Sequence, residues 1–395
     1  MRFVFTEEQE SFRQEVQEFL QEELAAGRFQ TRSGVLMVEE TSVELSRRMA
    51  QKGWIGLTWP KKFGGQERTY VEKAIMMEEM LKVQAPIGFH YMGDRQVGPA
   101  IIKFGSDWQK EYFLPRIIKA EANTRFCLLF SEPNAGSDLV NVGTRAVKDG
   151  DQYIINGQKA WTSAGHLADY GWLLARTNSD PSIPKHLGCS EFILDLKTPG
   201  ITIRPIINMA GKHSFNEVFF DDVRIDRKFL VGKENDGFKQ IMAQMDYERS
   251  GLERLMQNYP IYTLLLNYVK GKGKDGFGPE FYSWVRDSLA QLEIEFSVGR
   301  LLCYYTAWNI DQGRQPSAEA AMAKAYCNEY EQRLNDLATR VFGPHSQIKS
   351  EGVWTINAGG LAESYLWQPS YTLQGGPVEV LKNIIALRKL NLPRK

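Results

Sequence analysis

Hydrophobic and polar positions along the chain change their spacing twice. Up to about residue 122, apolar side chains recur every three or four positions, which is the spacing of the buried face of a helix. Thr6 and Gln9 form a capping-box pattern at the start of the first such stretch. The stretches with this spacing cover residues 12–20, 43–51, 71–81 and 108–120. This pattern predicts a helical N-terminal part, residues 1–122.

Between residues 123 and 235 the pattern changes to short runs rich in β-branched and aromatic side chains. These runs cover residues 126–130, 153–155, 170–175, 191–196, 201–206 and 217–220. Asn156 and Gly157 directly follow Ile155, and an Asn-Gly pair in such a context is a strong signal for a type I′ hairpin turn. Short strands with turn signals at this spacing predict an antiparallel sheet or barrel.

Helical spacing returns after about residue 235. Along the clearest stretch the apolar positions are Tyr326, Tyr330, Leu334, Leu337 and Val341. Pro377 suits the first turn of a last helix, where a missing backbone amide proton is tolerated. Helices, then a sheet, then helices predict an α+β fold rather than a doubly wound sheet. We therefore expect three domains: residues 1–122, 123–235 and 236–395.

Composition and charge narrow the class of protein. The 395 residues carry 48 Lys and Arg against 48 Asp and Glu. This balance argues against a nucleic-acid-binding or polybasic membrane-surface protein, although it permits a local cationic patch for an anionic ligand. No apolar run reaches the roughly 18 residues of a membrane span. The cysteines and histidines form no cluster with disulfide or metal-ligand spacing, so we expect a cytoplasmic protein with reduced thiols and no metal site.

A glycine-rich segment at residues 271–276 superficially matches the G-x-G-x-x-G fingerprint of dinucleotide-binding domains, and Glu293 lies at a suitable distance after it. That fingerprint requires a preceding strand. The flanking segments instead have helical spacing, with Ile261 and Leu265 before the glycines and Leu289 after them. We interpret the segment as a flexible, Lys- and Gly-rich connection between two helices.

The most specific motif of the chain is FSEPNAGSD at residues 130–138. Taken alone, it is a strand that ends in a Pro-, Asn- and Gly-containing turn. The backbone amides and hydroxyls of such a turn could hold a polar ligand or simply cap the turn. A second motif, IINGQKAW, follows at residues 154–161.

Together these two motifs resemble the acyl-CoA dehydrogenases. Further matches to that family are GWIGLTWPKKFGG at 53–65, FNEVFFDDVRI at 215–225, VGKENDGF at 231–238, DYER at 246–249 and NIIA at 383–386. Their order and spacing cover nearly the whole chain. The resemblance implies a helical N-terminal domain, a central β domain and a C-terminal four-helix bundle, with FAD bound between the last two.

The resemblance also implies roles for individual residues. Trp161 would cover one face of the flavin ring, Ser163 would lie near its N5 atom, and Ser137 would lie where cofactor and thioester substrate meet. A large aromatic side chain gives wide stacking area at little entropic cost, and a buried flavin needs hydrogen-bond partners for its polar atoms. The implied cofactor-binding residues are Leu128, Leu129, Phe130, Ser131, Ser137, Trp161, Thr162, Ser163, Lys274, Arg340 and Gly343.

The reaction of the family removes an α-proton from an acyl-CoA while the β-hydrogen leaves as hydride to flavin N5, which yields the trans-2-enoyl-CoA. This chemistry needs a carboxylate base. Many members carry the base just before the last helix, where this chain has Gly375. Isovaleryl- and long-chain-type members place it on another helix, and the matching residue here is Glu248. The alternative is a surface glutamate paired with Arg249 or Arg254. The implied substrate-binding residues are Ser137, Asp246, Arg249, Gly375 and Gly376.

Two departures from the family pattern suggest an assembly of unlike subunits. Lys274 stands where many relatives carry an arginine that reaches the FAD pyrophosphate of a neighbouring subunit. The segment RVFGP at 340–344 replaces a Gln-x-x-Gly-Gly pattern, and Arg340 could restore a pyrophosphate contact. These changes resemble heterotetrameric members, which include enzymes for bulky, steroid-derived acyl-CoA esters.

We therefore expect an FAD-dependent acyl-CoA dehydrogenase that passes electrons to an electron-transfer flavoprotein, as a homotetramer or an α2β2 heterotetramer. One alternative is a weakly catalytic or non-catalytic subunit that completes the flavin site of a partner; Gly375 and Lys274 favour it, whereas the intact 131–138 and 161–163 motifs oppose it. The other alternative is an oxidase or flavin monooxygenase on the same fold, which the presence of Glu248 disfavours.

Overall fold

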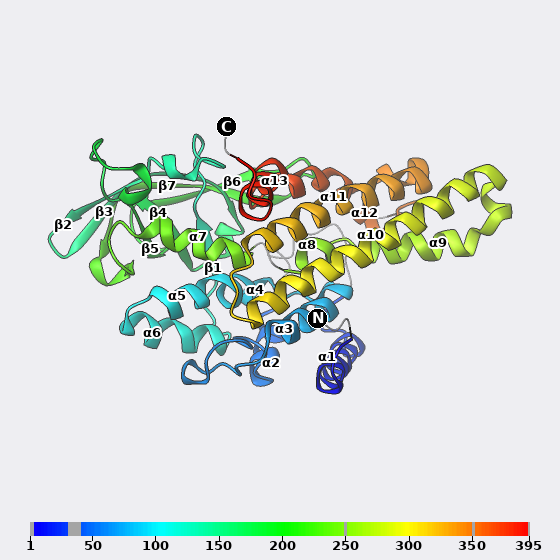
Figure 1. Ribbon diagram of the computed structural model, residues 1–395, viewed down its shortest axis with the longest axis horizontal. Coiled ribbons are helices and arrows are strands. Elements are labelled where there is room, and N and C mark those ends of the chain that lie inside the picture. The colour runs from blue at the N-terminus through cyan, green and yellow to red at the C-terminus, as the bar shows by residue number, and fades with distance from the viewer. Residues whose placement is uncertain (1–3, 31–40, 249–250, 350–351, 394–395) are drawn as a thin grey trace. The chain divides into compact units, whose positions relative to one another are not determined.

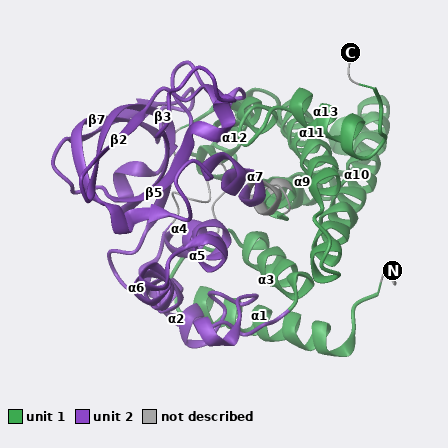
Figure 2. Ribbon diagram, turned by 60° about the vertical axis from the view of Figure 1, so that its left-hand side comes forward, with its two compact units in different colours: residues 1–37, 69–85, 249–395 green, residues 38–68, 86–248 purple. Residues whose placement is uncertain are grey.

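The computed structural model describes residues 4–30, 41–248, 251–349 and 352–393 (Figure 1). The chain forms two compact units, coloured separately in Figure 2. Unit 1 comprises residues 1–37, 69–85 and 249–395, and unit 2 comprises residues 38–68 and 86–248. The predicted helix at 71–81 therefore packs with the first N-terminal helix and with C-terminal helices, and it belongs to a different unit from the predicted helices at 43–51 and 108–120.

Unit 2 is built on a sheet with the strand order β6-β7-β3-β2-β4-β5-β8, and β1 lies beside β4. The strands are β1 (Phe126–Leu129), β2 (Arg145–Asp149), β3 (Gln152–Ser163), β4 (Tyr170–Arg176), β5 (Cys189–Asp195), β6 (Ile201–Ile207), β7 (His213–Asp226) and β8 (Leu230–Val231). Most pairs are antiparallel, as predicted, but β4 pairs in parallel with both β1 and β2. Inward-facing side chains such as Tyr153, Phe192 and Val218 form the core.

The helices of unit 2 are α2 (Val43–Gln51), α4 (Gly88–Met92), α5 (Gly98–Phe104), α6 (Asp107–Ile118) and α7 (Gly237–Glu248). The stretches predicted at 43–51 and 108–120 are confirmed by α2 and α6. A π-helical turn at Gly93–Val97, which the sequence pattern did not indicate, joins α4 to α5. The α+β class is confirmed.

The hairpin expected at Asn156 and Gly157 is wrong. Strand β3 continues through both residues, and the turn between β2 and β3 instead falls at Gly150, which has a left-handed φ of 60°. Gly157 lies at a bulge in the pairing of β3 with β7. A Cβ atom there would meet the Thr144 Cα at 2.7 Å, so the glycine permits close approach of the neighbouring chain rather than a turn.

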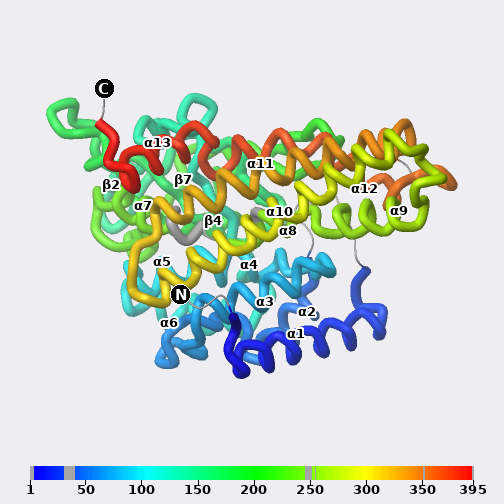
Figure 3. Tube along the Cα trace, turned by 45° about the vertical axis from the view of Figure 1, so that its right-hand side comes forward, coloured from blue at the N-terminus to red at the C-terminus, as the bar shows by residue number. Residues whose placement is uncertain are grey.

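Unit 1 is helical throughout its regular elements. Its α-helices are α1 (Glu7–Ala25), α3 (Tyr70–Lys82), α8 (Glu253–Met256), α9 (Tyr259–Phe277), α10 (Pro279–Asp311), α11 (Ser317–Phe342), α12 (Gly360–Trp367) and α13 (Val378–Arg388). The long helices α10 and α11 lie side by side (Figure 3). Both capping-box bonds between Thr6 and Gln9 are present at α1, and α13 begins directly after Pro377.

The glycine-rich segment 271–276 contains a kink at which two helical stretches of α9 meet, so a connection between helices lies here, as predicted. The helix runs on to Phe277, with a break at Gly273, where φ is 60° and ψ is −170°. Helix α10 follows directly after Gly278. A helix on each side of the glycines confirms that the dinucleotide-binding interpretation does not apply.

An ion-pair network joins α1, α3 and α10 within unit 1. The buried Glu78 carboxylate accepts from Arg300 Nε (2.6 Å) and Nη2 (3.0 Å) and from Arg13 Nη1 (3.1 Å), and the Tyr304 hydroxyl donates to it as well. Burial alone would raise the pKa of Glu78, but Arg300 and Tyr304 outweigh burial and lower it to about 2. The network therefore stabilises unit 1 only while Glu78 is ionised.

Replacing Glu78 with glutamine should lower the free energy of unfolding by about 3 kcal/mol at neutral pH, because Arg300 loses its buried counter-charge and Arg13 keeps, among the described residues, only Glu79 and Glu10. The pKa of Glu78 is lower in the folded state than in the unfolded chain, so this stabilisation is present above about pH 4 and disappears as the pH falls towards 2. Urea denaturation of both proteins at several pH values measures the difference. The exposed Glu22→Gln is the control, and an equally small effect of both changes would contradict the prediction.

Candidate functional site

The segment 130–138 forms a tight turn after β1. The Glu132 amide donates to the Ala135 carbonyl (2.9 Å), and the Ala135 amide donates back to the Glu132 carbonyl (3.1 Å). Ala135 is buried, Ser131 is half-buried and Ser137 is exposed. The turn is therefore anchored by its alanine, while its serines remain accessible.

A buried ion pair fixes this turn to the sheet. The Glu132 carboxylate accepts from the amides of Gly143 (2.6 Å) and Thr144 (2.9 Å), and from Lys159 Nζ (2.8 Å). Lys159 is fully buried on β3 and also donates to the Phe130 carbonyl (3.0 Å). The sequence motifs did not single out either residue, although a lysine at an inward-facing strand position signals a buried partner.

Burial and pairing act against each other in this pair. Burial lowers the pKa of Lys159 to about 8, although the neighbouring Glu132 opposes that change. Burial would raise the pKa of Glu132, but the charge and hydrogen bond of Lys159 outweigh burial and hold this pKa below its usual range. The carboxylate is therefore ionised at neutral pH and depends on the lysine.

Trp161 lies in an irregular part of β3. The register with β7 shifts between Lys159 and Thr162, and Trp161 has a left-handed φ of 61°. Its side chain is 59% exposed and meets the Phe215 ring edge to face at 5.8 Å. A bulky residue in this backbone conformation is strained. The fold therefore presents a large aromatic surface at the face of unit 2 at some conformational cost.

Asn216 on β7 holds the strand behind Trp161. This buried amide donates through Nδ2 to the Thr162 carbonyl (3.0 Å) and lies 3.2 Å from His166 Nδ1, while its Oδ1 lies 2.7 Å from His213 Nε2. The two imidazole rings stack at 3.8 Å. Because Asn216 Nδ2 is a donor and Oδ1 an acceptor, His166 accepts and His213 donates. Asn216 is a third residue that sequence reasoning did not single out, after Glu132 and Lys159.

Two further features of unit 2 offer hydrogen-bond capacity. Among the described residues β1 has strand pairing with β4 alone, so the main chain of Leu128 and Leu129 keeps one edge free of a strand partner. Thr162 is buried, and its Oγ1 has no hydrogen-bond partner within the described part of the chain. Three segments thus lie together in unit 2: strand β1, the turn after it, and the end of β3 at Trp161–Ser163. They carry polar groups that have no hydrogen-bond partner among the described residues.

Helix α7 carries the predicted base at its end. Glu248 is the last residue of the helix, and Asp246 lies in the same turn. The side chains of both residues and the whole of Arg249 lie outside the described residues. The helix begins at Gly237, where a Cβ atom would lie 2.7 Å from the Ser190 Cα, so its N-terminus packs closely on β5.

The loop around Gly375 lies in unit 1 and is held by α11. Gly375 and Gly376 have left-handed φ values of 64° and 102°. The buried Lys324 donates to the carbonyls of Gln374 (2.7 Å) and Gly376 (3.0 Å). A glutamate at position 375 would have to adopt a strained backbone conformation, which explains why this loop carries glycines rather than an acid.

The residues predicted to reach the FAD pyrophosphate also belong to unit 1. Lys274 is exposed near the end of α9. Arg340, in the last turn of α11, pairs with Asp336 at 2.9 Å, and Gly343 ends the helix with a φ of 59°. The residues predicted to contact the flavin ring all belong to unit 2. The structure thus groups the predicted site residues into two sets, one in each unit.

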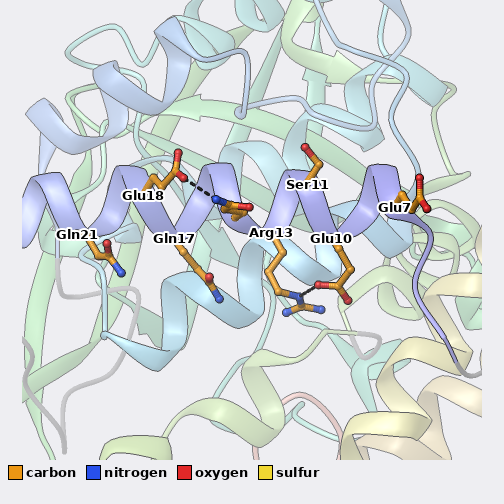
Figure 4. Close-up of a pocket in the computed structure, with 8 residues that line it drawn as sticks. Glu7, Glu10, Ser11, Arg13, Gln17, Glu18 and Gln21 are labelled. Atoms are coloured by element: carbon orange, nitrogen blue, oxygen red, sulfur yellow. Dashed lines mark hydrogen bonds and ion pairs between the residues drawn. The ribbon is translucent and has the colours of Figure 1, made fainter.

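A surface concavity of about 700 Å³ along α1 is a poor candidate for a site (Figure 4). Its lining comes from α1 alone, and Arg13 is already bonded to Glu10 and to the Glu78 carboxylate. Gln14 and Glu18 bond to each other at 2.9 Å. Within the described ranges, no three His, Cys, Asp or Glu side chains are placed to hold a metal ion, and none of the helices is long and apolar enough to cross a membrane.

Comparison with known families accounts for almost the whole chain. Residues 6–121 match the acyl-CoA dehydrogenase N-terminal domain, residues 127–223 the middle domain and residues 235–390 the C-terminal domain. Acyl-CoA dehydrogenase FadE29 of Mycobacterium tuberculosis is 34% identical over 88% of both chains. FadE26 of the same organism is 32% identical over 100% of this chain and 99% of that protein.

Solved structures agree with this assignment. The Tcur3481-Tcur3483 steroid ACAD superimposes over the full length of both chains with a TM-score of 0.87 and 28% identity. The ChsE4-ChsE5 complex from Mycobacterium tuberculosis does so with a TM-score of 0.83 and 31% identity. From its motifs, its fold and these relatives, the chain belongs to the acyl-CoA dehydrogenase family of oxidoreductases.

Proposed function

We propose that the chain catalyses the α,β-dehydrogenation of an acyl-CoA thioester, with Glu248 as the base that takes the α-proton. FAD is the cofactor of this family, and when bound it accepts the β-hydrogen as hydride at N5. The observation that carries the proposal is the strained, exposed Trp161 beside the turn 130–138, which the Glu132–Lys159 pair anchors. Such a surface suits a flat, polar-edged ring.

The residues of unit 2 fit the flavin on three counts. Trp161 offers an exposed aromatic face, and β1 offers main-chain groups on an edge without a strand partner among the described residues. The buried Thr162 Oγ1 lacks a partner in the same set. Since unpaired buried polar groups are unfavourable, a ligand that bonds to them would stabilise this region. Ser131, Ser137 and Ser163 would supply further hydroxyls, and Lys274, Arg340 and Gly343 would serve the pyrophosphate.

Glu248 is proposed as the base because it ends α7 in the DYER segment, whereas Gly375 has no side chain to accept a proton. Asp246, Arg249, Gly375 and Gly376 are proposed to contact the substrate, together with Ser137. The steroid ACAD among the structural relatives and the two glycines without side chains in the 375–376 loop favour a bulky, polycyclic acyl group.

We further propose that the chain works in the cytoplasm as three domains, with the boundaries given above, in a tetramer with a related subunit. One structural relative is named as the ChsE4-ChsE5 complex, and another carries the paired name Tcur3481-Tcur3483. An apolar stripe on α10 supports the assembly: Ile294, Val298 and Leu301 recur at helical spacing and are 58%, 37% and 43% exposed. An electron-transfer flavoprotein would then reoxidise the flavin.

Replacing Trp161 with glycine should weaken FAD binding roughly tenfold, since aromatic stacking contributes about 0.5–1.5 kcal/mol beyond simple burial. The free energy of unfolding without FAD should change by less than about 1 kcal/mol, because glycine accepts the left-handed backbone without strain. Titration of flavin fluorescence measures the affinity, and Trp161→Phe serves as the conservative control. Unchanged FAD affinity in Trp161→Gly would show that the indole does not cover the cofactor.

Three measurements test the proposed function. Anaerobic mixing with straight-chain, branched and steroid-type acyl-CoA esters should bleach the flavin absorbance, most rapidly with the bulky esters. Native mass spectrometry of the protein from its host cell should show a complex with a second acyl-CoA dehydrogenase chain, and a homotetramer would contradict that part of the proposal. Rapid oxygen consumption during turnover would instead indicate an oxidase or monooxygenase.

A further inference from the structure

A fully buried carboxyl group lies between the sheet and α7 within unit 2. Glu191 on β5 has no exposed surface. Its Oε1 accepts from the indole Nε1 of Trp172 on β4 (2.8 Å), and its two oxygens lie 3.1 and 2.9 Å from Gln244 Nε2 on α7. Trp172 and Gln244 are themselves buried. Figure 1 shows α7 close to β5, so this cluster joins the helix to the sheet.

The surroundings of Glu191 favour its neutral form. Among the described residues its hydrogen-bond partners are uncharged, and burial raises its pKa to about 8 even though the bonds from Trp172 and Gln244 oppose the change. The Gln244 Oε1 atom has no partner within the described residues. Because the oxygen and nitrogen of an amide are assigned from its contacts, a half-turn of this amide would let Oε1 accept from a Glu191 hydroxyl. In that orientation a protonated Glu191 donates to Gln244, and the bond between the sheet and α7 is kept without a buried charge.

Strand β5 and its neighbour β8 support α7 at three points along its length. Gly237, at the start of the helix, packs against the Ser190 backbone. Gln240 donates through Nε2 to the Val231 carbonyl of β8 (3.2 Å). Gln244 bonds to Glu191, one helical turn before Glu248. The Glu191 contact is thus the described anchor nearest to the end of the helix that carries the proposed base.

We propose that Glu191, as a neutral carboxylic acid, is a positioning residue that holds the last turn of α7 through Gln244 and so sets where Glu248 acts. The inference rests on the proposed function, because it assigns a consequence to the position of Glu248. Glu191 lies on β5 and Gln244 on α7. The two residues are proposed to position α7 without contacting substrate or cofactor.

The kinetic test compares two substitutions of the same residue. In Glu191→Gln, the new amide can accept from Trp172 and donate to Gln244 Oε1, so the rate constant of anaerobic flavin reduction should stay within about threefold of wild type. In Glu191→Leu, both bonds are lost, and the rate constant should fall roughly 100-fold while the acyl-CoA dissociation constant changes little. Gln244→Leu removes the same hydrogen bond from the side of the helix, and the rate constant should fall by a similar factor. This variant serves as the test if Glu191→Leu does not fold.

Infrared spectroscopy, which does not depend on catalysis, tests directly whether the Glu191 carboxyl group is neutral. Infrared difference spectra between pH 7 and pH 9 should show the loss of a carboxylic-acid band that Glu191→Gln abolishes. Glu331 in unit 1, whose pKa burial also raises to about 8, provides the matched control: Glu331→Gln should abolish a different band. Hydrogen exchange should be faster in the last turn of α7 in Glu191→Leu than in Glu191→Gln.

Some results would overturn the inference. Wild-type rates in both Glu191→Leu and Gln244→Leu would show that the cluster does not position the helix. An unchanged infrared band in Glu191→Gln would show that Glu191 is ionised. If no acyl-CoA ester reduced the flavin in wild type, the proposed function would fail, whereas the infrared and exchange measurements would still decide whether a neutral Glu191 anchors α7.

Discussion

Glu248→Gln should slow anaerobic flavin reduction by an acyl-CoA ester roughly 100- to 10,000-fold, since this is the range that a positioned general base contributes. The glutamine keeps the size of the side chain but cannot accept the α-proton. FAD content should stay unchanged, because Glu248 is not among the residues proposed to hold the cofactor. Stopped-flow absorbance of the flavin measures the rate constant, and spectra of the purified proteins measure the cofactor content.

The chain offers a matched control and a stricter test for this prediction. Glu379 is an exposed acid in the first turn of α13, near the 375–376 loop in sequence, and Glu379→Gln should leave the rate unchanged. Adding Gly375→Glu to Glu248→Gln should not restore activity, because a left-handed backbone costs a non-glycine residue about 1–2 kcal/mol. A fast Glu248→Gln enzyme would contradict the assignment of the base, whereas rescue by Gly375→Glu would show that the 375–376 loop can supply an acid despite the strained backbone.

Lys159→Met should lower the free energy of unfolding by about 3–5 kcal/mol, the range for a buried ion pair that loses one partner. The Glu132 carboxylate would keep its bonds from Gly143 and Thr144 but lose its cation, and the Phe130 carbonyl would lose a donor. Because this pair anchors the turn 130–138, FAD affinity should fall as well. Denaturant unfolding and flavin titration measure the two effects.

A double variant separates the charge from the packing. Replacing Glu132 with leucine in the Lys159→Met background removes the unpaired charge, so the double variant should be more stable than Lys159→Met alone. The exposed Lys148→Met on β2 is the control and should change stability by less than about 0.5 kcal/mol. An equally small effect of Lys159→Met would show that the pair contributes little.

The spacing of apolar residues correctly predicted those helices and strands whose formation depends on residues close together in the sequence. Helices α2 and α6 and most strands follow from apolar spacing, because their buried faces repeat within a few residues. The predicted hairpin at Asn156-Gly157 is wrong because Gly157 is required by the close approach of Thr144, the residue before β2, rather than by a turn. The parallel pairing of β1 with β4 joins two segments that lie far apart in the sequence. No local pattern of residues predicts such a pairing.

The candidate site shows the same limit. Motif resemblance pointed to Ser131 and Trp161, but the residues that hold them lie far away in sequence. Lys159 reaches Glu132 across 27 positions, and Asn216 reaches Thr162 across 54. The cluster of Glu191 and Gln244 spans 53 positions. Such partners become visible only when the fold brings their elements together, although a lysine facing the core was a usable signal.

The central claim, dehydrogenation of an acyl-CoA ester at a flavin, is tested most directly by one anaerobic titration. The purified FAD-containing protein, in the assembly isolated from its host cell, is mixed with a steroid-type acyl-CoA ester. Flavin absorbance and the CoA product are then followed together. We expect that the flavin is bleached and that one trans-2-enoyl-CoA forms for each flavin. A protein that holds FAD but shows no bleaching with any straight-chain, branched or steroid-type acyl-CoA ester would contradict it.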